Sequence, residues 1–200
     1  MRLAILEALN AERLARRAAA LATQLKGGEV RLVKASDVAA DPLGEEIAAR
    51  FRSGQSGIVE TPAGDVFLTI SVPPPRLVVI GAVHITQALA PMAAIAGFDV
   101  TIIDPRTAFA TPERFPDATL VADWPEDVLK KRPFDAYTAL AAVTHDPKID
   151  DIPIIAALQA GCHVNVEKPM ACSTVEAERM VAAAKKAKKL LNVNQSQRRF

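Results

Sequence analysis

Three short polar segments follow apolar segments that have the composition of buried strands. Gly81 to His84 follow "RLVVI", Thr144 to Asp146 follow "TALAAV", and Glu167 to Pro169 follow "HVNV". If the apolar segments are parallel strands, these turns meet at the edge of the sheet where α/β folds bind ligands. Glycine turns bind phosphates there, and histidine or lysine side chains exchange protons. The predicted ligand-binding edge comprises Gly81, Ala82, Val83, His84, Thr144, His145, Asp146, Glu167 and Lys168.

The first turn departs from the dinucleotide fingerprint G-x-G-x-x-G. Gly81 occupies the first glycine position, but Val83 and Thr86 occupy the second and third. Gly81 can still make a tight turn, and the amides of the following helix attract an anion. Val83 is β-branched and adds bulk where the backbone normally approaches a pyrophosphate. The alternatives are therefore an intact dinucleotide, a different phosphate-bearing ligand, or no ligand.

An acidic residue ends the second apolar segment of this region. Asp104 lies about 20 residues beyond the glycine turn, where a carboxylate accepts the ribose hydroxyls of NAD. Arg106 would instead accommodate a 2′-phosphate, and Asp104 can also simply cap the following turn. His84 and His145 face the same edge, where Asp146 or Asp104 could join them in an acid/base pair or a metal site. Their spacing carries no metal-ligand pattern, so no metal site is predicted.

The elements that must position these residues follow from the apolar pattern after residue 75. The predicted strands are 77–80, 98–103, 119–122, 137–142, 163–166 and 190–194. Their alternation with helical segments predicts parallel strands joined by right-handed crossovers. The expected fold is α/β, with a doubly wound, parallel, Rossmann-like sheet of order 3-2-1-4-5-6. In this order the first and fourth strands are neighbours, and their turns face the ligand.

The chain before this sheet is predicted to form a small α+β region. Apolar residues at helical spacing predict a helix over residues 3–25, and a second helix follows Asp41 and ends before Gly54. The segments "GIVE" and "VFLTISV", separated by "TPAGD", predict a hairpin. The three prolines at 73–75 cannot donate hydrogen bonds to a sheet, so we place a boundary there. The expected domains are residues 1–75 and 76–200.

Composition excludes several classes of partner. Lys and Arg number 24 and Asp and Glu 23, and a formal net charge of +1 gives no electrostatic basis for binding nucleic acid or a membrane. No apolar run approaches the roughly 20 residues of a membrane span. The two cysteines, Cys162 and Cys172, predict reduced thiols in a cytoplasmic protein. The open C-terminal edge of the sheet and the N-terminal helix favour homo-oligomers.

Several motifs up to about residue 158 resemble the XdhC/CoxI family, namely "PPPRLVVIGAVHITQALAPMA", "GFDVTIIDPRTAFATPERFPDA", "ADWPED" and "THDPKIDD". These proteins are accessory factors for molybdenum-cofactor enzymes such as xanthine dehydrogenase, and they carry a G-A-x-H-x-x-Q-A-L turn. The resemblance implies a pterin-type molybdenum cofactor as ligand. It implies a molybdenum hydroxylase apoenzyme and cofactor-supplying proteins as partners. The implied site residues are Gly81, His84, Gln87, Asp104, Arg106, His145 and Asp146.

The segment from about residue 160 to 200, with "GCHVNVEKPMACSTVEAERM", resembles instead the Gfo/Idh/MocA oxidoreductases, which are NAD(P)-dependent. Their E-K-P lysine lies beside the nicotinamide, which implies a catalytic role for Lys168 under an oxidoreductase function. The two resemblances imply a junction between about Asp150 and His163, from a gene fusion or a chimera. Three functions stay open: an XdhC-like accessory protein, an NAD(P)-binding domain without its substrate domain, and a folded chimera without activity.

Overall fold

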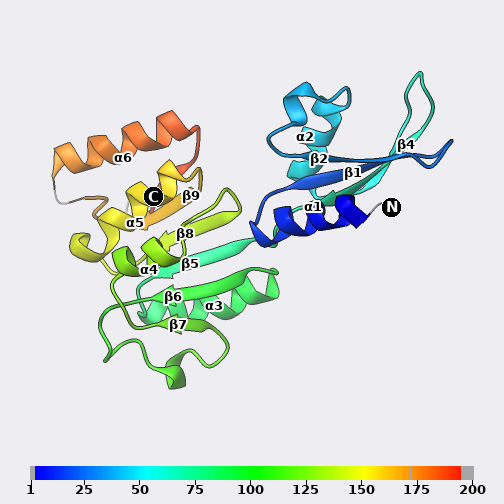
Figure 1. The fold of residues 1–200 in the computed structure, drawn as a ribbon. Coiled ribbons are helices and arrows are strands. Elements are labelled where there is room, and N and C mark those ends of the chain that lie inside the picture. Colours follow the sequence, from blue (N-terminus) through cyan, green and yellow to red (C-terminus); the bar gives the residue numbers. More distant parts are fainter. Residues whose placement is uncertain (1–2, 172, 195–200) are drawn as a thin grey trace. The chain divides into compact units, whose positions relative to one another are not determined.

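The computed structural model describes residues 3–171 and 173–194, and its contacts divide the chain between Pro73 and Pro74. Each of the two units is built around its own sheet, and Figure 1 labels their elements. Among the described residues, no helix combines the length and the apolar composition needed to cross a membrane.

The second unit contains the parallel sheet that the sequence predicts. Its strands in the described residues are β5 (Arg76–Ile80), β6 (Asp99–Ile103), β7 (Thr119–Val121), β8 (Thr138–Ala142), β9 (His163–Glu167) and β10 (Leu191–Asn194). Their order is β10-β9-β8-β5-β6-β7, and every pair is parallel. This order confirms the Rossmann-like prediction. Ile80 pairs with Ile103 and with Ala142, so the carboxyl ends of these three strands lie level.

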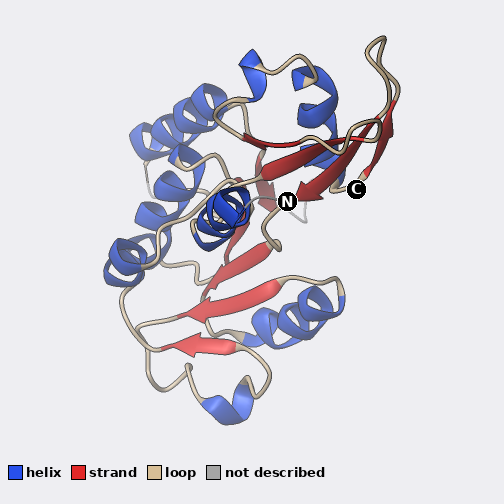
Figure 2. Cartoon of the chain, turned by 45° about the vertical axis from the view of Figure 1, so that its right-hand side comes forward, coloured by secondary structure: helices blue, strands red, loops and turns tan. Residues whose placement is uncertain are grey.

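Helices cover both faces of this sheet, as Figure 2 shows by element type. On one face α3 (His84–Ile95) packs Ala90 and Ala93 against the strands. The other face carries α4 (Pro125–Lys131), α5 (Pro147–Gln159) and α6 (Thr174–Ala187). Alternate residues of β5 pack into the hydrophobic cores on the two faces of the sheet, because successive side chains of a strand point to opposite faces.

The first unit is a small α+β fold. Its described elements are α1 (Leu3–Leu14), β1 (Ala19–Gln24), β2 (Val30–Lys34), a 3-10 turn (Val38–Ala40), α2 (Gly44–Ser53), β3 (Gly57–Val59) and β4 (Val66–Ser71). The strands form an antiparallel sheet of order β2-β1-β4-β3. Ile47 of α2 is fully buried against Ala20, Ala22 and Leu68 of this sheet.

The predicted helix over residues 3–25 is wrong in its second half. α1 ends at Leu14, the chain turns at Arg16 with a φ of 51°, and β1 follows. β1 pairs with β2 on one side and with β4 on the other, and these pairings override the helical propensity of its alanines. Leu14, which the helical stripe would bury, is 87% exposed.

Candidate functional site

The turn between β5 and α3 requires glycine at its first position. Gly81 has a φ of +120°, which residues with a side chain rarely adopt. A Cβ atom at this position would lie 2.9 Å from Cγ2 of Thr144 and 3.3 Å from its backbone nitrogen. The turn is therefore pressed against the carboxyl end of β8.

The other two fingerprint positions have ordinary roles. Val83 has φ −97° and ψ 177°, an extended conformation that suits a β-branched residue, and it immediately precedes α3. Thr86 is fully buried, and its hydroxyl donates a hydrogen bond of 2.6 Å to the Gly81 carbonyl. The Thr86 hydrogen bond therefore closes a turn that differs from the regular dinucleotide-binding turn. The N-terminus of α3 still provides partial positive charge to an anion, and His84 is exposed there.

Asp104 ties the end of β6 to this turn. Its carboxylate is fully buried and, within the described residues, accepts four hydrogen bonds. Ala82 N donates at 2.8 Å, and Arg106 donates from its backbone N, Nε and Nη2 at 2.9, 2.9 and 2.8 Å. A carboxylate offers about four lone-pair positions, so this one has none left for ribose hydroxyls. Asp104 also caps the turn that follows it, which was one of its two predicted roles.

The Asp104–Arg106 pair places a fixed cation at the Gly81 turn. Burial acts to raise the pKa of the Asp104 carboxyl, but the hydrogen bonds from Arg106 and Ala82 outweigh it, so this pKa lies below its usual range. The hydrogen bond to Asp104 raises the pKa of Arg106, with smaller contributions from Asp146 and Asp150. The Arg106 side chain is one-third exposed and lies 4.6 Å from the centre of the Phe109 ring.

Arg114 also belongs to this region, although no sequence motif predicts it. It ends a 3-10 turn (Pro112–Arg114) in the loop between β6 and β7. Its Nη1 donates to the carbonyls of Ala82 and Phe109 at 2.8 and 2.7 Å, and its Nη2 donates to Oε1 of Gln87 at 3.2 Å. Arg114 thus fastens the loop to the glycine turn and orients Gln87. No local spacing signals this role, because Ala82 and Gln87 lie 32 and 27 residues away in the sequence.

We expect Arg114→Ala to lower the free energy of unfolding by about 1 kcal/mol, because the hydrogen bonds lost are partly exposed. Chemical denaturation monitored by circular dichroism would measure the change. Arg179→Ala is the matched control, since Arg179 lies exposed on α6. Equal stability of the wild type and Arg114→Ala would contradict the role of Arg114 as a fastener.

The ends of β8 and β9 are joined to each other. His145 has a φ of 60°, and its Nδ1 lies 2.7 Å from the Lys168 carbonyl. Asp146 precedes α5, accepts from Lys148 N at 3.0 Å, and donates from its own amide to the Thr144 hydroxyl at 2.9 Å. Glu167 accepts from the side-chain amide of Asn194. The structure therefore brings the predicted residues of four strand ends to one edge, with the side chains of His84 and Lys168 exposed.

Asp150 is a second residue that the sequence reasoning missed. It lies in the first turn of α5, is 5% exposed, and its Oδ1 has no hydrogen-bond partner among the described residues. Burial raises the pKa of this carboxyl to about 6, although hydrogen bonds with Thr144 oppose the increase.

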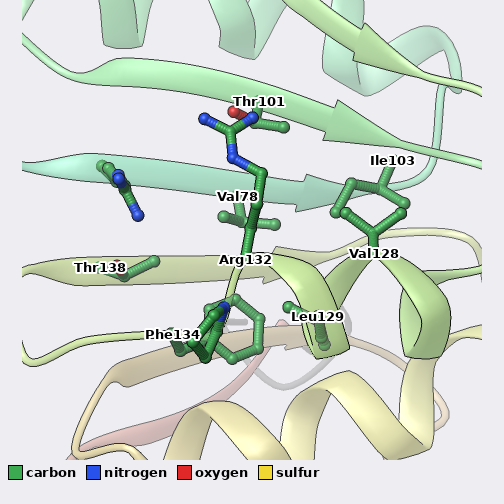
Figure 3. A pocket seen from close by; sticks show the side chains of 10 residues that line it. Val78, Thr101, Ile103, Val128, Leu129, Arg132, Phe134 and Thr138 are labelled. Atoms are coloured by element: carbon green, nitrogen blue, oxygen red, sulfur yellow. The ribbon is translucent and has the colours of Figure 1, made fainter.

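Hollows of different size lie among the described residues of this unit. One, of about 210 Å³, lies between α3 and the segment before β7 and is lined by Gln87, Pro91, Arg114 and Phe115. The other, of about 20 Å³, lies between α4 and strands β5, β6 and β8, and Figure 3 shows Arg132 extending towards Thr101 there. The second hollow has room for about one water molecule.

The described residues offer no group of three or more His, Cys, Asp or Glu that could hold a metal ion. Cys162 is buried, its thiol donates to the Asp135 carbonyl at 3.2 Å, and burial raises its pKa to about 12. This thiol is therefore unreactive at neutral pH. Cys172 lies outside the described residues.

The strand order, with a glycine turn and a helix N-terminus between β5 and β8, defines a Rossmann-type domain. The family model for the XdhC Rossmann domain matches residues 77–197, more than half of the chain. The chain therefore belongs to the XdhC family. The match continues across the expected junction between Asp150 and His163.

Curated relatives match over short segments. The uncharacterized protein YqeB of Escherichia coli is 42% identical over 57 residues, which are 28% of this chain and 10% of YqeB. A probable xanthine dehydrogenase subunit of Bacillus subtilis is 35% identical over 82 residues, 40% of this chain and 25% of that protein. This chain thus spans a quarter or less of these relatives' length.

Two solved structures are similar to this chain. A xanthine dehydrogenase from Bacillus halodurans has a TM-score of 0.56 at 19% identity, covering 96% of this chain and 58% of that one, and shares its fold. The WlbA dehydrogenase from Bordetella pertussis, solved with NADH and UDP-GlcNAcA, has a TM-score of 0.50 at 25% identity. The match covers 63% of this chain and 36% of the dehydrogenase chain. These similarities support both resemblances seen in the sequence.

Proposed function

We propose that this chain is an XdhC-type accessory protein that binds a phosphate-bearing, pterin-type molybdenum cofactor for a molybdenum hydroxylase such as xanthine dehydrogenase. Membership of the XdhC family supports the accessory role, as does the xanthine dehydrogenase relative from Bacillus subtilis. The cofactor-binding residues of the proposal are Gly81, Ala82, Val83, His84, Gln87, Asp104, Arg106, Thr144, His145, Asp146, Glu167 and Lys168.

The Asp104–Arg106 pair is the observation that carries this proposal. An NAD site uses a carboxylate at the end of the second strand to accept ribose hydroxyls. Here Arg106 and Ala82 N occupy that carboxylate, and the group left near the turn is the Arg106 guanidinium. A cation beside a helix N-terminus suits a phosphate group.

The residues present fit the phosphate end of such a cofactor. The amides at the start of α3 bind the phosphate and the Arg106 guanidinium donates hydrogen bonds to it, while Asp104 holds Arg106 in place. When bound in a client enzyme, the cofactor supplies a redox-active molybdenum.

A second candidate is an NAD(P)-binding domain of the Gfo/Idh/MocA type. The similarity to the WlbA dehydrogenase, which was solved with NADH, favours it. In this function Lys168 would be the catalytic residue, and its carbonyl contact with His145 would hold it at the edge. The occupied carboxylate of Asp104 weighs against NAD, whereas Arg106 would accommodate the 2′-phosphate of NADP.

A thermal-shift panel separates these functions, because a ligand that binds the folded state raises the unfolding midpoint. We expect molybdopterin at about 100 times its dissociation constant to stabilise the protein by about 2.7 kcal/mol, which raises the midpoint by several degrees. A shift with NADH or NADPH and none with molybdopterin would overturn the proposal in favour of the oxidoreductase function. A midpoint indifferent to all three ligands would indicate a folded chimera without activity.

A further inference from the structure

The hollow of about 210 Å³ beside α3 is mostly apolar. One of its walls is a side of α3, where residues at helical spacing line it: Gln87, Ala90, Pro91 and Ala94. The opposite wall is the chain from Arg114 to Ala118, in which Phe115 is buried. The polar side chains of the lining are those of Gln87, Arg114 and Asp117. A ligand that fills this hollow therefore needs a hydrocarbon body.

The volume of the hollow limits the size of that body. A cavity of about 150 Å³ with apolar walls is sufficient for benzene. Sites for larger organic ligands usually have about 300 to 1,000 Å³. The hollow beside α3 therefore has room for one six-membered ring with a small substituent.

Arg114 is held in a fixed position at this hollow. Its Nη1 donates to the carbonyls of Ala82 and Phe109, and its Nη2 donates to Oε1 of Gln87. The guanidinium carbon also lies 5.3 Å from the centre of the Phe115 ring. A ligand group that binds Arg114 therefore loses little free energy in ordering this side chain.

No carboxylate of the described residues balances the charge of Arg114. Its hydrogen-bond acceptors are neutral oxygen atoms, whereas Arg106 is paired with Asp104. These contacts use at most three of the five N–H groups of the guanidinium, so at least two remain. Water can accept from these donors, but only an anion also balances the charge. A carboxylate suits them because it accepts two neighbouring N–H donors at once.

Asp117 restricts the ligand to one negative charge. This exposed side chain lines the hollow and lies three residues beyond Arg114 in the chain. A second anionic group, on the far side of a ring, would lose hydration against the apolar walls and would meet the negative charge of Asp117. The lining therefore favours a monoanion over a phosphate or a dicarboxylate.

We propose that this hollow binds a small monocarboxylate whose apolar body is about the size of one six-membered ring. Its carboxylate accepts hydrogen bonds from Arg114, and its ring packs between Ala90, Ala94 and Phe115. This inference goes beyond the proposed function and does not depend on it, because the hollow lies along α3 and takes no phosphate. Arg114 connects the two places, since it contacts both Ala82 of the glycine turn and Gln87.

A titration of the full chain with benzoate, followed by NMR of its backbone amides, tests this site. We expect saturable shifts of the Ala90 and Phe115 signals, with a dissociation constant on the order of 1 mM for so small a ligand. Benzyl alcohol, which lacks the charge, and terephthalate, which adds a second carboxylate, should each bind at least about tenfold more weakly. Equal affinity for benzoate and benzyl alcohol, or no saturable shift with benzoate, would overturn the proposal.

Two alanines of α3 provide a matched pair of variants that locates the ligand. Ala94 and Ala88 are both exposed, but only Ala94 lines the hollow. Ala94→Leu fills part of the hollow and should weaken benzoate binding at least about tenfold, whereas Ala88→Leu should bind it like the wild type. Similar unfolding midpoints of the two variants would show that both keep the fold. Wild-type benzoate affinity in Ala94→Leu would place the ligand elsewhere and overturn the proposal.

A third variant and a competitor separate the charge and the location from other causes. Arg114→Gln should bind benzoate no better than benzyl alcohol, and a preference that persisted would contradict the role of Arg114. Saturating inorganic pyrophosphate should leave wild-type benzoate affinity within about threefold, because phosphate is proposed to bind at the start of α3. Displacement of benzoate by pyrophosphate would overturn this inference and leave the proposed function standing. Benzoate binding in a protein that binds neither pyrophosphate nor molybdopterin would overturn the proposed function only.

Discussion

Replacement of Gly81 with alanine is expected to lower the free energy of unfolding by about 3 kcal/mol, one of the two largest effects that we predict for a single substitution. Two costs add at this position. The φ of +120° strains any residue with a side chain, and the new Cβ would meet Thr144 at 2.9 Å and Val143 Cγ2 at 3.2 Å. Chemical denaturation of the purified variant would measure the change. The variant should also lose affinity for phosphate, because the turn cannot keep its shape.

Gly97→Ala is the control that separates the two costs. Gly97 also has a positive φ, +87°, but no atom lies within 4 Å of its missing side chain. We expect this substitution to cost about 1 kcal/mol through the backbone conformation. If Gly81→Ala and Gly97→Ala lowered the free energy of unfolding by similar amounts, the contact with the end of β8 would not contribute to the cost of Gly81→Ala.

Replacement of Asp104 with asparagine should also cost about 3 kcal/mol. The change removes the charge of a fully buried carboxylate and leaves Arg106 without its ion-pair partner. Because one-third of the Arg106 side chain is exposed, water can solvate the unpaired guanidinium and so reduce the loss of stability. Urea denaturation at neutral pH would measure it, with Asp117→Asn, an exposed position in the same loop, as the control.

The effect of Asp104→Asn should depend on pH in a defined direction. The folded state lowers the pKa of Asp104, so its stabilising contribution is complete above the ordinary aspartate pKa and is lost as the pH falls through the folded value. The difference in stability between the wild type and the variant should therefore be full near neutral pH and shrink in acid. A difference that grew on acidification would contradict the ion pair.

The sequence predicts the sheet well because its apolar runs are continuous and its crossovers follow strict rules of handedness. It fails at β1, where "AALATQ" has the composition of a helix and forms a strand because partners lie on both sides. Gly81 alone is enough to predict the glycine turn. The sequence does not predict the contact of Arg114 with Ala82, because these residues are far apart in the chain. It does not predict the enclosure of Asp150 Oδ1 either, because burial depends on the tertiary packing.

Equilibrium titration of the purified chain with molybdopterin, with inorganic pyrophosphate as competitor, tests whether the cofactor binds at the Gly81 turn. We expect saturable binding at micromolar concentrations, about one ligand per chain, that pyrophosphate displaces because both occupy the start of α3 beside Arg106. The absence of saturable binding, or binding that pyrophosphate leaves unchanged, would contradict it.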